Sequence, residues 1–354
     1  MSDDVAVTES LEPDQEVAEG ATVAEGATVA EAGMSRRTLI ILICVAAGVL
    51  ALLGLALAWY VITGKSPTQI PGLSKEIPPH YSRAIYDVSA PLGVALDEKN
   101  DRVYITQSSG DRKVAIFTLD GTRVGNLPTP GNAKVAHMPI YVAVDPLTQD
   151  VFVTDRAAAA LYQYDSSGNY LRTVIPRGVA KWNPMALCFD TSGLLYVSDV
   201  SGKIPVIYQM RTDGEVIRKL GAKDKLSFVN GLVVQSNGTL AVADSNNGRV
   251  LIYGASPEAE GGLARGKADA PLGLPRGLAV DDRERLYVVD TVNQIVRVYL
   301  PADDGTPIPV YAFSFGGQGT ADGAFEYPNG IAVTSRNQLF ITDRGNNRVQ
   351  VWSY

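Results

Sequence analysis

The sequence predicts an all-β fold: a six-bladed β-propeller with four-stranded blades, preceded by one transmembrane helix and a disordered acidic tail. Short apolar runs separated by turn residues recur six times, at positions marked by Pro91, Pro139, Pro184, Asn230, Pro275 and Tyr327. A unit of this length does not bury its own apolar face, so neighbouring units must pack side by side. Upstream of the repeats, residues 39–62 form a run of 24 residues without a charge.

Residues 1–37 are expected to form a disordered cytoplasmic tail. This stretch holds nine acidic residues against Arg36 and Arg37, and therefore carries a net charge of −7, which equals that of the whole chain. It has few large apolar residues, and residues 17–22 and 23–28 repeat the same six letters. Such a composition does not bury enough surface to offset the entropy of ordering.

The neutral remainder of the chain argues against a nucleic-acid partner. Acidic and basic residues balance over 38–354, and nucleic-acid binding needs clustered Lys and Arg. RNA binding is therefore the least favoured function.

A transmembrane helix is predicted at 38–63, where it serves as an uncleaved signal anchor in the lipid bilayer. At about 1.5 Å per residue, the uncharged run spans the roughly 30 Å hydrocarbon core. Trp59 and Tyr60 lie near its end, as is typical of the membrane interface. Arg36 and Arg37 flank its start, so the positive-inside rule places the N-terminus in the cytoplasm. The propeller is then extracytoplasmic and the protein a single-pass protein of the cell membrane.

Two alternatives for this segment leave the propeller on the same side. Ser35-Arg-Arg-Thr-Leu-Ile resembles a twin-arginine export signal, and residues 56–58 offer a small-residue cleavage site.

Residues 64–81 contain Pro67, Pro71, Pro78 and Pro79, and this composition predicts a semi-extended linker.

The propeller is predicted at 82–354. In the fifth repeat the expected strands are 277–280, 286–289, 295–299 and about 309–314, from the innermost to the outermost. The sixth repeat ends after its third strand, whereas residues 84–88 precede the first repeat. We expect this N-terminal segment to supply the outer strand of the last blade, because such closure hides sheet edges.

An acidic residue recurs directly after the second strand of five repeats. Asp accepts hydrogen bonds from backbone amides in turns, and Arg249, Arg348 and, less securely, Arg297 are suitable partners. A structural role is therefore predicted for these carboxylates, rather than catalysis. They are Asp155, Asp199, Asp244, Asp290 and Asp343.

The motifs resemble the NHL-repeat family of β-propellers, of the membrane-anchored bacterial type, over residues 82–354. The resemblance rests on Pro91-Leu-Gly93, on the run Leu286 to Asp290 and on Asn247-Gly-Arg249. The second and third repeats lack the Asn-x-Arg element, and Gln107 replaces Asp in the first. The resemblance implies a binding or sensing role, because NHL propellers on bacterial membrane kinases are thought to act as sensors.

Varied residues at fixed loop positions are the better candidates for ligand contacts, since binding is usually tuned there on a repeated scaffold. In a propeller, the residues leading into the first strand and the loop after the second strand emerge on one face, around the channel. The predicted ligand-binding residues of this face are Gln107, His137, Tyr141, Arg156, Trp182, Asn183, Asn230, Arg276, Asn329 and Arg344.

The sequence favours a membrane-anchored extracytoplasmic binding, scaffold or sensor module for a protein, peptide or envelope ligand. No catalytic residue, metal or cofactor is predicted. The alternative is a propeller enzyme, a lyase or metal-dependent hydrolase acting at the channel mouth. Amidating lyases of similar fold use several His residues around zinc, but this chain has only His80 and His137, and His80 falls in the predicted linker.

Overall fold

The computed structural model describes residues 35–63, 77–131, 136–263, 272–302 and 305–354. It divides into two units, Met1–Lys75 and Glu76–Tyr354, which are described separately. Nearly all of the predicted tail and most of the predicted linker lie outside the described residues.

The described part of the first unit is the apolar helix α1 (Arg36–Thr63) with the residue before it. Ser35 precedes it, and its hydroxyl accepts a hydrogen bond from the Thr38 amide at 3.2 Å, which satisfies one of the free donors of the first turn. Large apolar side chains are exposed along the helix from Leu39 to Leu57. The stretch Arg36–Leu55 is long and apolar enough to cross a membrane by length and composition. A helix that is apolar on all sides is typical of a membrane span or of a protein core.

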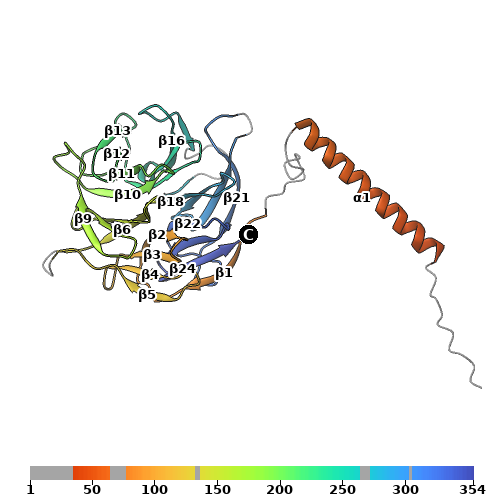
Figure 1. The fold of residues 1–354 in the computed structure, drawn as a ribbon, viewed down its shortest axis with the longest axis horizontal. Helices are drawn as coiled ribbons and strands as arrows, with labels where there is room; N and C mark the ends of the chain where they lie inside the picture. Colours follow the sequence, from red (N-terminus) through yellow and green to blue (C-terminus); the bar gives the residue numbers. More distant parts are fainter. Residues whose placement is uncertain (1–34, 64–76, 132–135, 264–271, 303–304) are drawn as a thin grey trace, which may run out of the picture. The chain divides into compact units, whose positions relative to one another are not determined.

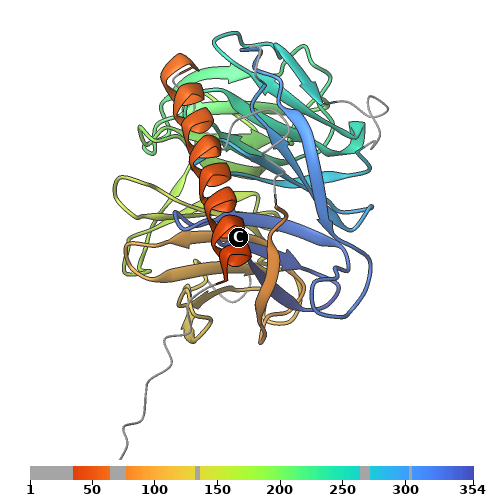
Figure 2. The ribbon, with the colours of Figure 1, turned by 90° about the vertical axis from the view of Figure 1, so that its right-hand side faces the viewer.

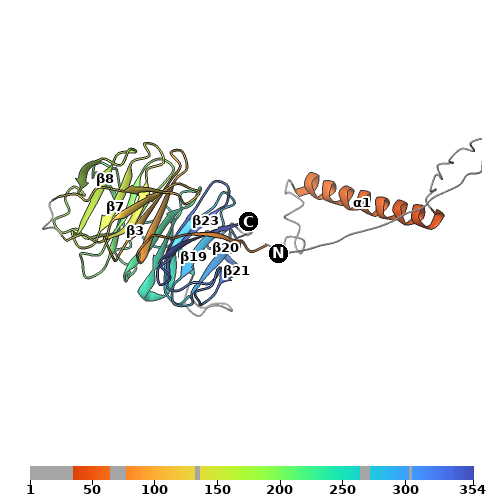
Figure 3. The ribbon, with the colours of Figure 1, turned by 90° about the horizontal axis from the view of Figure 1, so that it is seen from below.

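The second unit is an all-β propeller of six four-stranded sheets, as predicted (Figure 1). Within each blade the strands are antiparallel and hydrogen-bonded in radial order, and Figure 3 shows the propeller from its side. From the innermost strand outward, the blades are: blade 1, Pro91–Asp97 (β2), Arg102–Gln107 (β3), Val114–Phe117 (β4) and Arg123–Asn126 (β5); blade 2, Pro139–Val144 (β6), Val151–Asp155 (β7), Ala160–Tyr164 (β8) and Tyr170–Val174 (β9); blade 3, Pro184–Phe189 (β10), Leu195–Asp199 (β11), Val206–Met210 (β12) and Val216–Leu220 (β13); blade 4, Val229–Val234 (β14), Leu240–Asp244 (β15), Arg249–Tyr253 (β16) and Gly261–Leu263 (β17); blade 5, Pro275–Val280 (β18), Leu286–Asp290 (β19), Ile295–Leu300 (β20) and Val310–Gly316 (β21); and blade 6, Pro328–Val333 (β22), Leu339–Asp343 (β23), Arg348–Ser353 (β24) and His80–Ile85 (β1).

The ring is closed by an N-terminal outer strand, as predicted. Strand β1 pairs antiparallel with β24, from His80 opposite Ser353 to Ile85 opposite Val349, and Figure 2 shows the orange strand beside the blue ones. The strand lies at 80–85 and not at the expected 84–88. Asp87 has a positive φ of 64°, a left-handed conformation that ends the extended strand before it could reach residue 88.

The apolar core lies mainly between adjacent blades. One cluster joins Tyr196 of blade 3 to Leu232 and Leu251 of blade 4, and the other interfaces have similar clusters. The interface between blades 5 and 6 is dominated by Trp352, which is 5% exposed. Its ring centroid lies 4.7 Å from that of Phe315 and 6.3 Å from that of Tyr81 on the closing strand. This aromatic cluster therefore fixes the closure by packing as well as by hydrogen bonds.

We expect Trp352→Ala to lower the free energy of unfolding by about 3–5 kcal/mol, because it leaves a large cavity in a tightly packed cluster. Denaturant unfolding followed by circular dichroism measures the loss. Tyr311→Ala removes an aromatic ring that is 38% exposed on the outer strand β21 and serves as the control. Equal losses for the two variants would contradict the importance of the Trp352 cluster.

Candidate functional site

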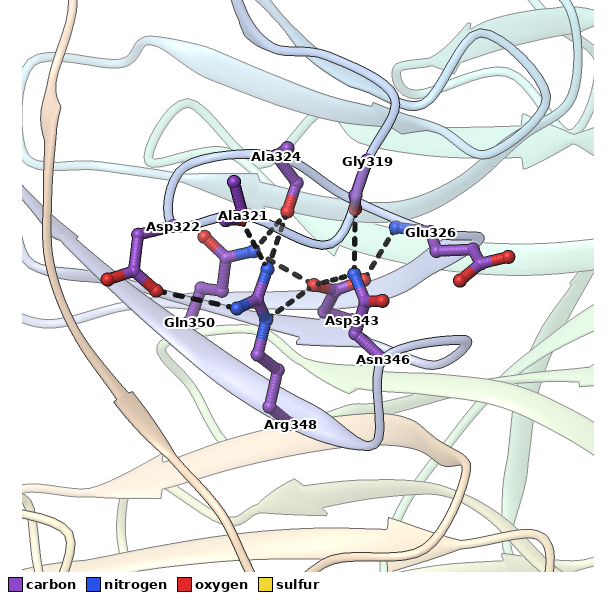
Figure 4. Close-up of polar contacts among 9 residues, drawn as sticks. All are labelled: Gly319, Ala321, Asp322, Ala324, Glu326, Asp343, Asn346, Arg348 and Gln350. Carbon is purple, nitrogen blue, oxygen red and sulfur yellow. Dashed lines mark hydrogen bonds and ion pairs between the residues drawn. The ribbon is translucent and has the colours of Figure 1, made fainter.

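The last residue of the second strand in each blade acts as a latch, a buried side-chain acceptor that binds a donor of the segment before the innermost strand and, in blades 2 to 6, also a donor of the loop after the second strand. Figure 4 shows the latch of blade 6. Asp343 accepts hydrogen bonds from the Glu326 amide at 2.7 Å, the Asn346 side chain at 2.8 Å, Arg348 Nε at 2.8 Å and the Gln350 side chain at 2.9 Å. One carboxylate thus connects the lead-in, which is the segment before the innermost strand, to the loop after the second strand and to the third strand.

Blades 4 and 5 repeat this arrangement with their own arginines. Asp244 accepts Arg249 Nε at 2.7 Å, and Asp290 accepts Arg297 Nε at 3.0 Å. The lead-in amides of Ser227 and Leu274 bind the same two carboxylates. The three arginines anticipated from the sequence therefore all pair with their latch residues.

Blades 2 and 3, which lack the Asn-x-Arg element, satisfy the latch with other donors. In blade 2, His137 Nδ1 lies 2.8 Å from Asp155 Oδ2, so a lead-in imidazole occupies the position of the missing guanidinium. In blade 3, the Ser201 hydroxyl donates to Asp199 Oδ2 at 3.1 Å, and the backbone amide of Asn183 donates to Asp199 Oδ1 at 3.0 Å.

Gln107 is the latch of blade 1. It is 6% exposed, and its amide oxygen accepts a hydrogen bond from the lead-in amide of Ser89 at 2.9 Å. The longer side chain of Gln thus replaces the repeated Asp as the acceptor. The structure places this predicted ligand-binding residue in the latch, away from the exposed surface of the channel mouth.

A second repeated bond, which sequence reasoning missed, joins one blade to the next. A buried Ser or Thr hydroxyl beside the latch donates to a lead-in or first-strand carbonyl of the following blade. Thr106 donates to the Ile140 carbonyl at 2.8 Å, and Thr342 donates to the Leu92 carbonyl at 2.9 Å across the closure. In the described part of the chain this bond occurs at five of the six blade interfaces. Its sequence signal is the recurrence of Ser or Thr directly before or after the latch.

Glycines allow the innermost strands of adjacent blades to approach each other closely around the channel. A Cβ atom on Gly277 would lie 2.5 Å from the Asn329 carbonyl oxygen of the next blade. A Cβ atom on Gly231 would collide with the Arg276 carbonyl oxygen, and one on Gly330 with that of Leu92. The repeated Pro-x-Gly element is thus explained by backbone contact between blades.

A β-bulge opens each innermost strand at the channel mouth, because the ladder with the second strand shifts directly after its first residue pair. Bulges redirect side chains and are frequent beside binding sites. The residue after the first pair is here called a member of the mouth ring. The six members are Leu92, Ile140, Met185, Asn230, Arg276 and Asn329.

The mouth ring is divided into two chemical halves. Leu92, Ile140 and Met185, from blades 1 to 3, form an apolar cluster that also includes the partly buried Met138 and Phe228. Blades 4 to 6 contribute only polar members. The three predicted residues Asn230, Arg276 and Asn329 are therefore brought together on one side of the channel mouth.

The side chain of Tyr141, in blade 2, contacts residues of other blades. Tyr141 stands where the other inner strands have Gly or Ala, and its side chain enters the channel. Its hydroxyl donates to Asn230 Oδ1 at 3.2 Å and lies 3.4 Å from Asn329 Nδ2. Arg276 then donates to Asn329 Oδ1 at 2.7 Å. Four predicted site residues thus form one network across the mouth, and burial raises the pKa of the Tyr141 phenol.

The charge of Arg276 is poorly balanced. Burial lowers the pKa of its guanidinium, Tyr141 opposes this effect, and the charge of Arg344 lowers the pKa again. Arg348 differs because, although burial alone would lower its pKa, Asp343 raises it. Within the described residues Arg276 has no carboxylate within ion-pair distance, and its Nε is buried without a hydrogen-bond partner.

The other predicted residues surround the mouth network on loops. Arg156 is exposed, and its guanidinium lies 5.4 Å from the centroid of the Phe228 ring. Trp182 packs against Tyr208 at 6.0 Å between ring centroids, and its Nε1 is buried without a partner. Arg344 is exposed on the loop after the second strand of blade 6.

The channel contains a cavity of about 60 Å³ that is lined by the innermost strands of all six blades. Tyr141 and Asn230 are among its lining residues, so the network borders this space. Since a water molecule needs about 10–15 Å³ of such volume, the cavity is large enough for a few waters.

No group of three or more His, Cys, Asp or Glu side chains in the described ranges is arranged to hold a metal ion. His137 is bound through Nδ1 to Asp155, whereas its Nε2 is buried without a hydrogen-bond partner. This dyad is the arrangement in the site that most resembles acid–base machinery.

The fold and the site together define a six-bladed β-propeller whose blades are fastened by latches at the channel face. The family model described as NHL repeat matches residues 325–352, which lie within blade 6. The chain thus carries an NHL repeat, and this match together with the six-blade arrangement confirms the resemblance to NHL-repeat propellers. No curated protein matches the chain by sequence.

Solved structures share the propeller fold. A streptogramin B lyase matches with a TM-score of 0.56 at 14% identity, over 78% of this chain and 98% of that one. Virginiamycin B lyase from Staphylococcus aureus gives 0.52 at 14% identity, over 75% and 94%. A gluconolactonase from Xanthomonas campestris gives 0.59 at 18% identity, over 78% and 95%. At these identities the similarity shows the fold alone.

We expect Asp343→Asn to destabilise the propeller by about 3 kcal/mol, because it removes the fully buried counterion of Arg348 and leaves that buried guanidinium only the exposed Asp322 carboxylate, 3.5 Å from its Nη1. Asp199→Asn is the matched control, since Asp199 binds backbone amides and a hydroxyl and the side-chain oxygen of Asn can still accept; a loss of about 1–2 kcal/mol is expected. Chemical unfolding of both variants measures the difference. A larger loss for Asp199→Asn would show that the ion pair is not the dominant part of the latch.

Gly231→Ala is expected to destabilise the propeller by at least 1–3 kcal/mol, the usual range for overpacking, because the added methyl group collides with the Arg276 backbone. Gly125→Ala, where a Cβ atom would meet nothing within 4 Å, is expected to change stability by less than about 1 kcal/mol. Thermal unfolding compares the two. Tolerance of both substitutions would contradict the proposed backbone contact between blades 4 and 5.

Proposed function

We propose that this protein is a membrane-anchored binding module that displays the channel mouth of its propeller outside the cytoplasm. The observation that carries the proposal is the mouth network of Tyr141, Asn230, Arg276 and Asn329, surrounded by loops whose residues differ from blade to blade. The repeated carboxylates accept hydrogen bonds from backbone and side-chain donors, which supports a structural role for them. The variable residues of the mouth are better suited to recognition.

The apolar helix α1 supports the anchoring part of the proposal. Arg36 and Arg37 lie at its start, and positive residues next to a membrane span favour the cytoplasmic side. The propeller follows the helix in the chain and would be exported. A protein, a peptide or an envelope component is then accessible as the ligand.

Replacement of Tyr327 by a photo-crosslinking phenylalanine analogue tests this function. Tyr327 is 54% exposed on the lead-in of blade 6, whereas Tyr311, the control position, is 38% exposed on the outer strand β21. Irradiation of cells and mass spectrometry are expected to give a discrete adduct from position 327 and none from position 311. Equal labelling from both positions, or no labelling from position 327, would argue against a binding role for this face.

A second candidate is an enzyme that acts at the channel mouth. Two observations favour it: the shared fold of a streptogramin B lyase and a gluconolactonase, and the free Nε2 of the His137–Asp155 dyad. To distinguish this enzyme from the binding module, the bound metal content and the rate of lactone hydrolysis are measured for the purified chain and for His137→Gln. Activity or stoichiometric metal that is lost in His137→Gln would establish the enzyme.

A further inference from the structure

The mouth ring presents opposite chemistry on its two sides, and the sides are not interchangeable. The three apolar members belong to consecutive blades, and so do the three polar members. A ligand that contacts the whole ring must therefore be amphipathic, with an apolar part toward blades 1 to 3 and a polar part toward blades 4 to 6.

The polar side favours a negative charge. Arg276 is the ring member that carries a charge, and within the described residues only the neutral Asn329 amide satisfies it. Arg344 adds a second positive charge whose influence reaches Arg276. A partly buried guanidinium without a counterion is unfavourable, and a carboxylate can accept two parallel hydrogen bonds from it. The buried Nε of Arg276, which lacks a partner, is one of the donors for such a pair.

The apolar side offers a surface for a hydrocarbon or aromatic group. Leu92, Ile140 and Met185 are each less than 9% exposed and form its floor, and the partly exposed Met138 and Phe228 extend it toward solvent. Methionine adapts its shape to apolar ligands, and the Phe228 ring adds an aromatic face. The charge of the exposed Arg156 lies over Phe228 and borders this surface.

We propose that the channel mouth binds an organic monocarboxylate that carries an adjacent apolar group, with the carboxylate on Arg276 and the apolar group on the Met138–Phe228 side. The proposal rests on the binding function proposed above and specifies its ligand class. Two sources share this chemistry: a free amphipathic acid, and the C-terminus of a peptide that ends in an apolar residue.

The test uses the full-length chain in nanodiscs and isothermal titration calorimetry. The probes are 4-phenylbutyrate, its neutral amide, and the tripeptide glycyl-glycyl-phenylalanine with a free or an amidated C-terminus. At least one of the two acids is expected to bind about tenfold or more tightly than its amide, because a charge-assisted hydrogen bond is lost in the amide. Preference for the small acid or for the peptide identifies the source.

Three variants assign the binding to the mouth. Arg276→Gln is expected to weaken acid binding about tenfold or more. Arg344→Gln lies on an exposed loop and does not threaten the fold, and we expect it to weaken binding severalfold. Arg177→Gln removes an exposed arginine that pairs with Asp213 away from the mouth, and it is expected to bind as the unmodified chain does.

Equal binding of acids and amides, no binding of any probe, or unchanged affinity in both Arg276→Gln and Arg344→Gln would overturn this inference. If Arg276→Gln does not fold, the affinity of Arg344→Gln for the acid probes decides whether the inference stands. The photo-crosslinking experiment remains independent of these outcomes. A discrete adduct at position 327 together with failure of all acid probes would reject the ligand class and leave the binding module standing.

Discussion

In blades 2 to 6, one carboxylate at the end of the second strand binds donors of both the lead-in and the loop after the second strand, and in blade 1 the Gln107 amide binds the lead-in. Without this acceptor, the lead-in would leave backbone amides, and the loop after the second strand a backbone or side-chain donor, to be satisfied by water. Asp343 connects Glu326, Asn346 and Arg348, so one buried carboxylate holds together the lead-in, the loop after the second strand and the third strand of its blade. The hydroxyl bonds between blades then transmit this order around the ring.

The fold was predictable because the features that specify it recur. The six repeats, the Pro-x-Gly elements and the Arg partners of the latches all appear as repeated letters, and closure followed from the unpaired third strand of the last repeat. The exact bounds of the closing strand were not predictable. They depend on the left-handed conformation of Asp87, and no nearby Gly indicates it.

Much less of the site could be predicted from the sequence. Tyr141, Asn230, Arg276 and Asn329 were selected only as varied residues on one face, and their direct network emerges from β-bulges that turn them toward the channel. Gln107 and His137 were selected for the same reason, yet Gln107 is the latch of blade 1 and His137 is a partner of the latch in blade 2. A departure from the repeat therefore has two physical origins, repair of a structural bond or a new surface, and only the geometry separates them.

The closing strand gives the propeller a mechanical property. The chain that leaves α1 enters the propeller through β1, the outermost strand of blade 6, and β1 is held by its ladder to β24 and by the packing of Tyr81 on Trp352. Tension between the helix and the propeller is therefore borne by the same strand that completes the ring. A load strong enough to peel β1 would expose the free edge of β24 before it disturbed any of the other five blades.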